Sequence, residues 1–413
     1  MKNSTLFILL FVLVNSCMDK KHKEEKQNVI HLENQTEEIF QIDPRRFEEN
    51  ELTLIDFAAD VKYVTLSNTV RLGLIRKIKV TRNAIYLVSD KSRGGEGNGY
   101  QELFRFDKNG QNPVQIGRIG KGPKEYLSSE YFAVDEQNSR IYISGKINIV
   151  LVFDTLGNYV RQFKFQNPNQ KFANLEYFGA NILFVPEQKR GAAGPHLWSV
   201  IDTLGNILSS KVNTATPFQT RMGARSGTFK FNNEISYWVD YNDTIFAISP
   251  DLSYKPAWII TPGEHRKPKK DLPFTLDLPE KLKEFYAPHY FFETNNYLIS
   301  QYNYKGKFAY VFISKVTHKT SISTFEWKKD TKGGIPNNFD GGLTFSPETY
   351  FTDDENEFLA GTIQPYQLKA HIASDEFKNS TPQYPEKKKE LEQLANSLDE
   401  NDNPVLMLVK LKE

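Results

Sequence analysis

Short apolar segments separated by polar turns recur along most of the chain. Six pairs of segments stand out, each made of two runs rich in aromatic and β-branched residues around a turn of Asn, Asp or Gly. Such a pair predicts a β-hairpin. The six predicted hairpins are IRKIKVTRNAIYLVSD (75–90), YFAVDEQNSRIYISGK (131–146), LEYFGANILFVPEQ (175–188), FKFNNEISYWVDY (229–241), YFFETNNYLISQY (290–302) and TYFTDDENEFLAGTI (349–363).

A third apolar segment follows each predicted hairpin. The six segments are LFRFDKNG (103–110), VLVFDTLGN (150–158), WSVIDTLGN (198–206), IFAISPDLS (245–253), YVFISKVTHK (310–319) and PVLMLVKLK (404–412). Their turns at Asp107, Asp154, Asp202 and Pro250 are 47, 48 and 48 residues apart, and Lys315 follows 65 residues later. A repeat of this length with several short strands is typical of one propeller blade.

The pattern therefore predicts an all-β fold, a six-bladed β-propeller over residues 41–413. A lone strand at Val61–Leu66 precedes the first hairpin, and the last blade lacks a fourth strand after Val405–Leu411. Pairing these N-terminal and C-terminal strands would close the ring and remove two exposed edges. The alternative is a β-sandwich followed by an α-helical domain, which explains the strand content but not the repeat.

One short helical insertion is expected near the C-terminus, at 385–398. Leu391, Leu394, Ala395 and Leu398 recur there at helical spacing, with charged residues on the opposite face. This helix would pack on the surface of the propeller, inside the last blade.

Composition narrows the function classes. The 413 residues include 52 Lys and Arg against 51 Asp and Glu, so no excess of positive charge indicates nucleic-acid binding. The single cysteine, Cys17, rules out an intrachain disulfide and a cysteine-based metal site. We expect no cofactor and a monomeric protein.

The N-terminus has the features of a processed export signal. A short apolar run, Leu6–Val14, follows Lys2 and leads to Val14-Asn15-Ser16-Cys17. This segment resembles the lipobox of bacterial lipoproteins, which implies a signal peptide at 1–16, a lipid on Cys17 and membrane attachment through that lipid. The polar residues 17–40 would form a flexible tether. A plain secretory signal or an N-terminal anchor helix is the alternative.

A longer motif points to a family. LFRFDKNG (103–110) followed by IGRIGKGPKEY (116–126) resembles the six-bladed β-propeller lipoproteins of Bacteroidetes, which are similar in pattern to NHL-repeat and TolB-like propellers. The resemblance implies an outer-membrane lipoprotein on the periplasmic face or the cell surface. It implies no activity, since members mostly lack an assigned one.

Blade topology places the long connections on one face, which we predict to be the binding surface. These connections are 89–101, 117–129, 186–196, 213–228, 261–288, 329–346 and 365–403. Basic residues gather in them, which suggests an anionic or polyhydroxylated ligand such as a charged glycan, or an envelope protein partner. The candidate ligand-binding residues are Arg118, Lys121, Glu125, Tyr126, Arg190, His196, Arg221, Arg225, His265 and Arg266. Ordinary solvated, lysine-rich loops would look the same.

Three of these candidates, Lys121, Glu125 and Tyr126, belong to the motif Gly-Lys-Gly-Pro-Lys-Glu-Tyr at 120–126. Glu125 and Tyr126 could project toward the mouth of the channel and contact a ligand. Alternatively, Glu125 caps backbone amides of a blade-joining turn and Tyr126 packs between blades.

Catalytic motifs such as G-x-S-x-G and H-E-x-x-H are missing from the sequence. We therefore predict a non-catalytic binding or scaffold protein and leave catalysis open. The alternative is a propeller hydrolase or lyase acting on glycans, with a site at the channel mouth. A metal ion held there by His196, His265 and His289 would favour this alternative. A structural subunit of an envelope complex is a third hypothesis.

Overall fold

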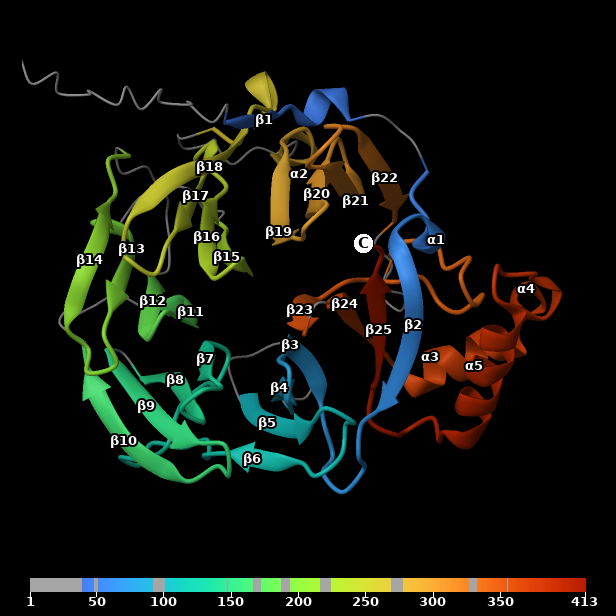
Figure 1. Cartoon of the computed structure of the whole chain (residues 1–413), viewed down its shortest axis with the longest axis horizontal. Helices are drawn as coiled ribbons and strands as arrows, with labels where there is room; N and C mark the ends of the chain where they lie inside the picture. Colours follow the sequence, from blue (N-terminus) through green and yellow to red (C-terminus); the bar gives the residue numbers. More distant parts are fainter. Residues whose placement is uncertain are drawn as a thin grey trace, which may run out of the picture. The chain divides into compact units, whose positions relative to one another are not determined.

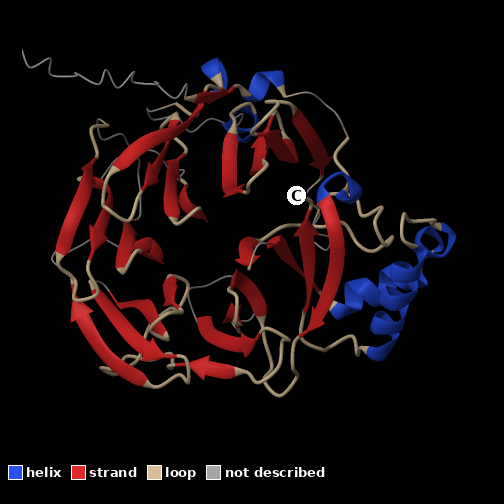
Figure 2. Ribbon diagram, in the orientation of Figure 1, coloured by secondary structure: helices blue, strands red, loops and turns tan. Residues whose placement is uncertain are grey.

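Six antiparallel sheets surround a central axis in the computed structural model (Figure 1). The structure describes residues 39–47, 51–91, 101–146, 148–165, 172–186, 194–215, 224–268, 278–326, 333–354 and 356–413. Ile39–Glu413 form one compact unit. Strands dominate it and helices are few (Figure 2). The predicted six-bladed β-propeller is confirmed, and the two-domain alternative is wrong.

Blades one to three follow in chain order, each running from an innermost to an outermost strand. Blade one contains β3 (Leu74–Val80), β4 (Ala84–Asp90), β5 (Gln101–Asp107) and β6 (Val114–Ile116). Blade two contains β7 (Phe132–Asp135), β8 (Arg140–Lys146), β9 (Ile149–Asp154) and β10 (Tyr159–Lys164). Blade three contains β11 (Phe172–Phe178), β12 (Asn181–Pro186), β13 (His196–Ile201) and β14 (Ile207–Val212).

Blades four and five continue the same arrangement. Blade four contains β15 (Ser226–Phe231), β16 (Glu234–Val239), β17 (Thr244–Ile248) and β18 (Tyr254–Ile260). Blade five contains β19 (Ala287–Glu293), β20 (Tyr297–Tyr304), β21 (Lys307–Ser314) and β22 (Thr320–Phe325). The sheet of blade four has a fifth strand, β1 (Phe40–Ile42), which the sequence pattern did not predict. It pairs in parallel with the outer edge of β18.

Blade six joins the two ends of the propeller. Its strands are β23 (Thr349–Asp353), β24 (Asn356–Ile363), β25 (Val405–Leu411) and β2 (Ala58–Thr65). The N-terminal strand β2 pairs antiparallel with β25, and Val61 lies opposite Val409. The predicted strand closure is confirmed, and hydrogen bonds between the two ends of the chain hold the ring together.

The recurring Asp turns show how a short motif positions a blade. In the turn after β9, the Asp154 carboxylate accepts hydrogen bonds from the backbone of Leu156 and Asn158 and from the Asn158 amide. Gly157 has a φ of 84°, and a Cβ atom there would collide with the carbonyl oxygen of Gln115 in blade one. The motif thus builds its own turn and presses it against the neighbouring blade.

The connection between β24 and β25 contains three helices. The predicted helix is confirmed as α5 (Pro385–Ser397), with Leu391 and Ala395 buried. Two more, α3 (Pro365–Ala373) and α4 (Asp375–Asn379), were not predicted. The expectation of one helix was too low because α3 and α4 are too short for an apolar period to stand out.

The remaining helical segments are single turns or little more. They are η1 (Pro44–Arg46), α1 (Leu54–Phe57), η2 (Gly263–His265) and α2 (Leu278–Lys283). No helix in the described part of the chain has both the length and the apolar composition needed to span a bilayer.

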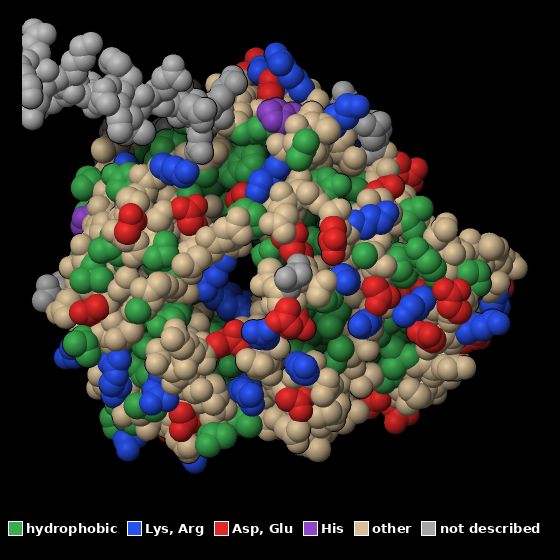
Figure 3. Space-filling model, in the orientation of Figure 1, with side chains coloured by type: hydrophobic (Ala, Val, Ile, Leu, Met, Phe, Trp, Pro, Cys, Tyr) green, Lys and Arg blue, Asp and Glu red, His purple; other side chains and the backbone are tan. Residues whose placement is uncertain are grey.

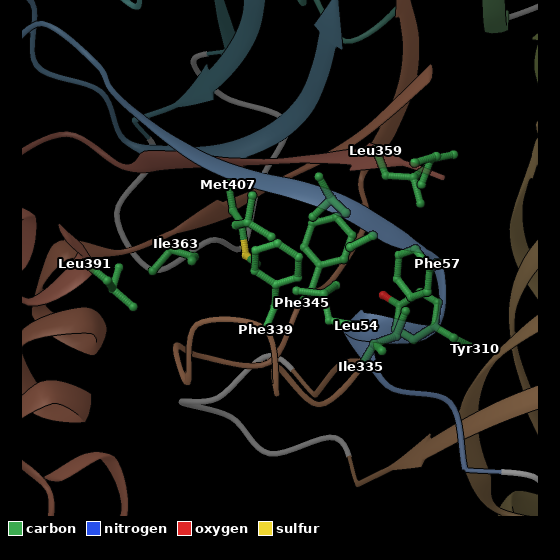
Figure 4. Packing of buried hydrophobic residues seen from close by; sticks show 14 of the residues in the cluster. Leu54, Phe57, Tyr310, Ile335, Phe339, Phe345, Leu359, Ile363, Leu391 and Met407 are labelled. Carbon is green, nitrogen blue, oxygen red and sulfur yellow. The ribbon is translucent and has the colours of Figure 1, made fainter. Parts of the chain in front are cut away.

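The largest core cluster lies in blade six and extends into blade five and α5 (Figure 4). Phe345 from the connection before β23, Met407 of β25 and Leu391 of α5 all belong to it. This packing attaches the helical insertion firmly to the propeller, at the outer edge of the ring beside β2 (Figure 1).

The closing strand pair is testable by substitution. Val61 is 2% exposed, so Val61→Asp buries an unpaired carboxylate and should lower the free energy of unfolding by about 3 kcal/mol or more. Urea denaturation measures this change. Lys62→Ser on the same strand is the control, since its side chain is 69% exposed, and it should change the free energy by no more than about 0.5 kcal/mol. Equal effects of the two substitutions would contradict a role of the strand pair in closure.

Candidate functional site

The long connections leave the sheets on one face of the propeller, as predicted. In each blade, the connection from the second to the third strand and the connection to the next blade lie at the same end of the antiparallel sheet. The connections β22–β23 and β24–β25 are both on this face, and the second of them carries α3, α4 and α5. We call this surface the long-connection face.

The structure spreads the predicted basic candidates around this face. Arg118 and Lys121 are exposed between blades one and two, and Arg225 is exposed just before β15 in blade four. His196 is half-buried at the start of β13, a third strand away from the axis. Arg190 and Arg221 lie outside the described residues, as does Cys17. The described candidates therefore form no single basic cluster.

Two basic residues of the β18–β19 connection are bound to blade four. Arg266 forms an ion pair with Asp243, and Lys267 Nζ lies 2.8 Å from Asp240 Oδ2. The side chain of Asp240 is only 2% exposed, so its charge needs a partner. These contacts hold the connection against the blade and leave little of the positive charge of Arg266 and Lys267 for a ligand.

His265 has a similar structural role. Its Nδ1 lies 3.1 Å from the Glu284 carbonyl oxygen, and its ring meets the edge of Tyr304 with centroids 5.1 Å apart. The side chain is 20% exposed. His265 thus connects the two ends of the β18–β19 connection.

Arg225 contacts a histidine across the boundary of blades four and five. Its Nη1 lies 2.9 Å from His289 Nδ1 and 3.0 Å from His289 Nε2, and Nε2 also lies 3.0 Å from Asn303 Oδ1. The amide oxygen can only accept, so Nε2 carries the proton and Nδ1 accepts from Arg225. Burial and the nearby guanidinium lower the pKa of His289 to about 4. His289 is therefore neutral at pH 7.

The Gly-Lys-Gly-Pro-Lys-Glu-Tyr motif forms a turn that joins blades one and two. Glu125 accepts a hydrogen bond of 2.8 Å from the backbone of Gly122. Tyr126 is fully buried, and its hydroxyl donates to the Ile116 carbonyl oxygen at 2.9 Å. Burial raises the pKa of Tyr126. The structure supports the capping and packing interpretation, and Tyr126 is out of reach of a ligand.

A large pocket opens on the long-connection face at blade six. Its volume is about 1080 Å³, and it lies between the connection before β23, the end of β24 and helices α3 and α4. Phe345, Ile363, Phe377 and Met407 contribute apolar surface. The polar and aromatic residues of its wall include Asn338, Ser346, Thr362, Tyr366, Gln367 and His371.

Internal hydrogen bonds hold one wall of this pocket in place. Asp340, which is 1% exposed, accepts from the Tyr63 hydroxyl at 2.8 Å, from the Asn337 amide at 2.7 Å and from the Gly342 backbone at 2.9 Å. Ile335 and Phe345 pair through two backbone hydrogen bonds of 2.8 Å. The wall is therefore formed before any ligand arrives.

The opposite wall comes from the helical insertion. The Tyr366 side chain, at the start of α3, is half exposed. His371 Nε2 lies 2.8 Å from the Gly341 carbonyl oxygen, which joins α3 to the first wall. The pocket thus depends on two connections that are separated in sequence by the hairpin β23–β24.

The candidate list drawn from the sequence contains none of the pocket residues. The sequence predicted that both connections are long and lie on this face. The candidate residues, however, were mostly basic side chains, and these lie in other connections. The available signal was the pair of Gly-Gly steps, Gly333-Gly334 and Gly341-Gly342, around Asn337. Such a loop indicates a tight, specific backbone path.

In the described part of the chain, no three His, Cys, Asp or Glu side chains are placed to hold a metal ion. His196, His265 and His289 lie in blade three, in the β18–β19 connection and in blade five, so the structure does not assemble them into the histidine site considered above.

Comparisons with known proteins match the fold described above. The family model described as Domain of unknown function (DUF4934) matches residues 37–410. A protein of Bacteroides fragilis described as exported superposes with a TM-score of 0.59 at 16% identity, over 90% of this chain and 100% of that chain. A protein of unknown function from Bacteroides thetaiotaomicron reaches a TM-score of 0.43 at 8% identity, over 85% and 75%. No curated protein matches the chain in sequence.

The state of His289 is open to direct measurement. Its pKa of about 4 lies below the value near 6.5 of the unfolded chain, so the unfolded state binds the proton first. The resulting contribution to stability is present above pH 6.5 and is lost as pH falls toward 4. NMR titration should give this pKa, and Arg225→Gln should raise it. Arg118→Gln is the control, and a pKa unchanged by Arg225→Gln would contradict the assigned contact.

Proposed function

The chain belongs to the family described as Domain of unknown function (DUF4934), and from that premise we propose that it is an exported, lipid-anchored binding protein of the cell envelope. Its ligand is a neutral glycan, held in the pocket at blade six. The protein acts without chemical change of this ligand, as a capture or scaffold component.

The pocket is the observation that carries this proposal. A volume of about 1080 Å³ is at the upper end of the range for small-molecule sites and accommodates several sugar rings. The hydrogen bonds around Asp340 fix one wall, so little conformational entropy is lost when a ligand binds.

The chemistry of the pocket favours a neutral, polyhydroxylated ligand. Asn338 and Gln367 contribute amide groups to the wall and Thr362 a hydroxyl, which are the polar groups that suit sugar hydroxyls. Internal hydrogen bonds orient two of them: Asn338 Oδ1 accepts from the Ile55 backbone at 3.1 Å, and the Thr362 hydroxyl donates to Glu348 at 2.8 Å. The described lining contains no Lys or Arg, and it includes the carboxylates of Glu326 and Glu376. An anionic glycan would meet like charge there, so the charged ligand expected from the basic loops does not fit this pocket.

Tyr366 supplies the apolar contact that sugar recognition needs. Its ring is half exposed on the first turn of α3, and Pro365 before it restricts the backbone. An exposed aromatic ring with a polar end can pack on the apolar face of a sugar ring while its hydroxyl stays hydrated.

The envelope location rests on the N-terminal sequence. Cys17 follows an apolar export-type segment, and the resemblance of 103–126 to Bacteroidetes lipoproteins supports the same placement. The exported Bacteroides fragilis protein with the same fold is consistent with it. The lipid would attach the propeller to the outer membrane, on the periplasmic face or the cell surface.

Binding can be tested with an array of neutral and acidic oligosaccharides. We expect the full chain without its signal to bind neutral oligosaccharides. Tyr366→Ala should weaken this binding about tenfold, a loss of about 1.4 kcal/mol. Tyr254→Ala removes an exposed tyrosine of blade four and serves as the matched control. The absence of any neutral ligand, or unchanged affinity of Tyr366→Ala, would overturn the proposal.

Anchoring is tested separately in a bacterial host that processes lipoproteins. Cys17→Ser should abolish incorporation of labelled palmitate and move the protein from the membrane fraction to the soluble fraction. Asn15→Ala, which leaves the cysteine in place, is the control. Retention of label in Cys17→Ser would show that Cys17 is not the lipidated residue.

A further inference from the structure

A cluster of charged side chains lies on the axis of the propeller, apart from the pocket of blade six. The innermost strands of the six sheets surround this axis. The space-filling view shows an opening at the centre of the ring with Lys or Arg side chains on its wall (Figure 3). Two of the innermost strands carry lysines that contact β11: β3 has Lys77 and Lys79, and β15 has Lys230.

Lys77 and Lys79 of β3 reach past blade two to blade three. Lys79 Nζ lies 2.7 Å from Glu176 Oε2, and Lys77 Nζ lies 2.9 Å from Asn174 Oδ1. Both ammonium groups also lie over the ring of Phe132. Lys77 Nζ is 5.9 Å and Lys79 Nζ is 5.3 Å from the ring centroid. These contacts join blade one to blade three, which are not neighbours in the ring.

Lys230 of β15 approaches the same carboxylate from the other side. Its Nζ lies 3.7 Å from Glu176 Oε2 and donates to the Tyr177 carbonyl oxygen at 2.5 Å. Thr228 on the same strand donates to Glu176 Oε1 at 3.3 Å. Three lysines from two strands therefore surround one glutamate of a third strand.

The charges of this cluster do not balance. Glu176 is ionised, because the lysines outweigh its burial and lower its pKa to about 2. Lys79 and Lys230 contact this one carboxylate. Among the described residues, Lys77 donates a hydrogen bond only to the neutral Asn174 amide. Glu130 acts on Lys77, and Glu136 on Lys230, only at longer range.

The imbalance affects Lys77 most. Burial, and then repulsion from Lys79, lower the pKa of Lys77 to about 8. Lys77 is half-buried, so its ammonium group loses hydration without a charged partner in contact, and an anion beside it would offset that cost.

We propose that the central channel between β3, β11 and β15 binds a small oxyanion, a phosphate or carboxylate group, through Lys77, Lys79 and Lys230. The anion would complete the charge that Glu176 only partly neutralises, with charge-assisted hydrogen bonds from the lysines. Lys230 is 46% exposed and Lys79 17%, so solvent reaches the cluster. The site lies toward the short-turn end of the channel, since Lys79 and Lys230 each precede the last residue of their strand.

Calorimetry and thermal denaturation of the full propeller test this site. Inorganic phosphate and citrate are titrated separately at low ionic strength, with sodium chloride of equal ionic strength as the blank for screening. We expect saturable binding of at least one oxyanion and a rise in melting temperature. The anion with the larger effect identifies the group that the site prefers.

Substitutions test whether the lysines bind the oxyanion. Lys77→Gln and Lys230→Gln should each weaken oxyanion binding at least tenfold. Lys164→Gln, which removes one exposed charge from the outer strand β10, is the matched control and should bind like the wild type.

The substitution Glu176→Gln should change the oxyanion affinity in the opposite direction. It removes the carboxylate that competes with the anion, so it should destabilise the free protein yet tighten oxyanion binding severalfold. A cluster that only supports the fold would be destabilised without this gain. No saturable binding by either the wild type or Glu176→Gln, or equal binding by the lysine variants, would overturn the proposal.

Discussion

The pairing of β2 with β25 is the interaction on which the rest of the structure depends. A propeller is a row of sheets that each contact mainly their neighbours, so it needs a closing contact between its first and last elements. Here seven residue pairs from opposite ends of the chain form that contact. Blade six therefore unites the N-terminal strand, the C-terminal strand and the core cluster with the largest number of elements.

The pocket at blade six shares elements with the closing strands. One of its walls comes from the connection between β24 and β25, which contains three helices. Their apolar faces pack into the same cluster as β2 and β25, while Tyr63 of β2 holds Asp340 in the opposite wall. The elements that close the ring thus also fix both walls of the proposed glycan site.

Positive charge is largely neutralised on the long-connection face but not in the central channel. On the long-connection face, several basic side chains are bound to local carboxylates, as Lys267 is to Asp240. Their positive charge stabilises the connections and is largely neutralised there. In the channel, Lys79 and Lys230 share the Glu176 carboxylate and Lys77 bonds to the neutral Asn174 amide, so positive charge remains. A count of basic residues along the sequence could not separate these two situations, because the difference lies in which acidic groups meet them.

The sequence by itself determined the blade number, the hairpins, the closing strands and α5, because each follows from local alternation, turn chemistry or helical spacing. The Asp154 turn shows this directly, since its hydrogen bonds run within five residues. Only the tertiary structure decided that Lys79 meets Glu176, 97 residues away, and that Thr362 and Gln367 share a pocket with Asn338. These meetings depend on the radius of the closed ring and on how two long connections pack, and no local pattern in the chain encodes either.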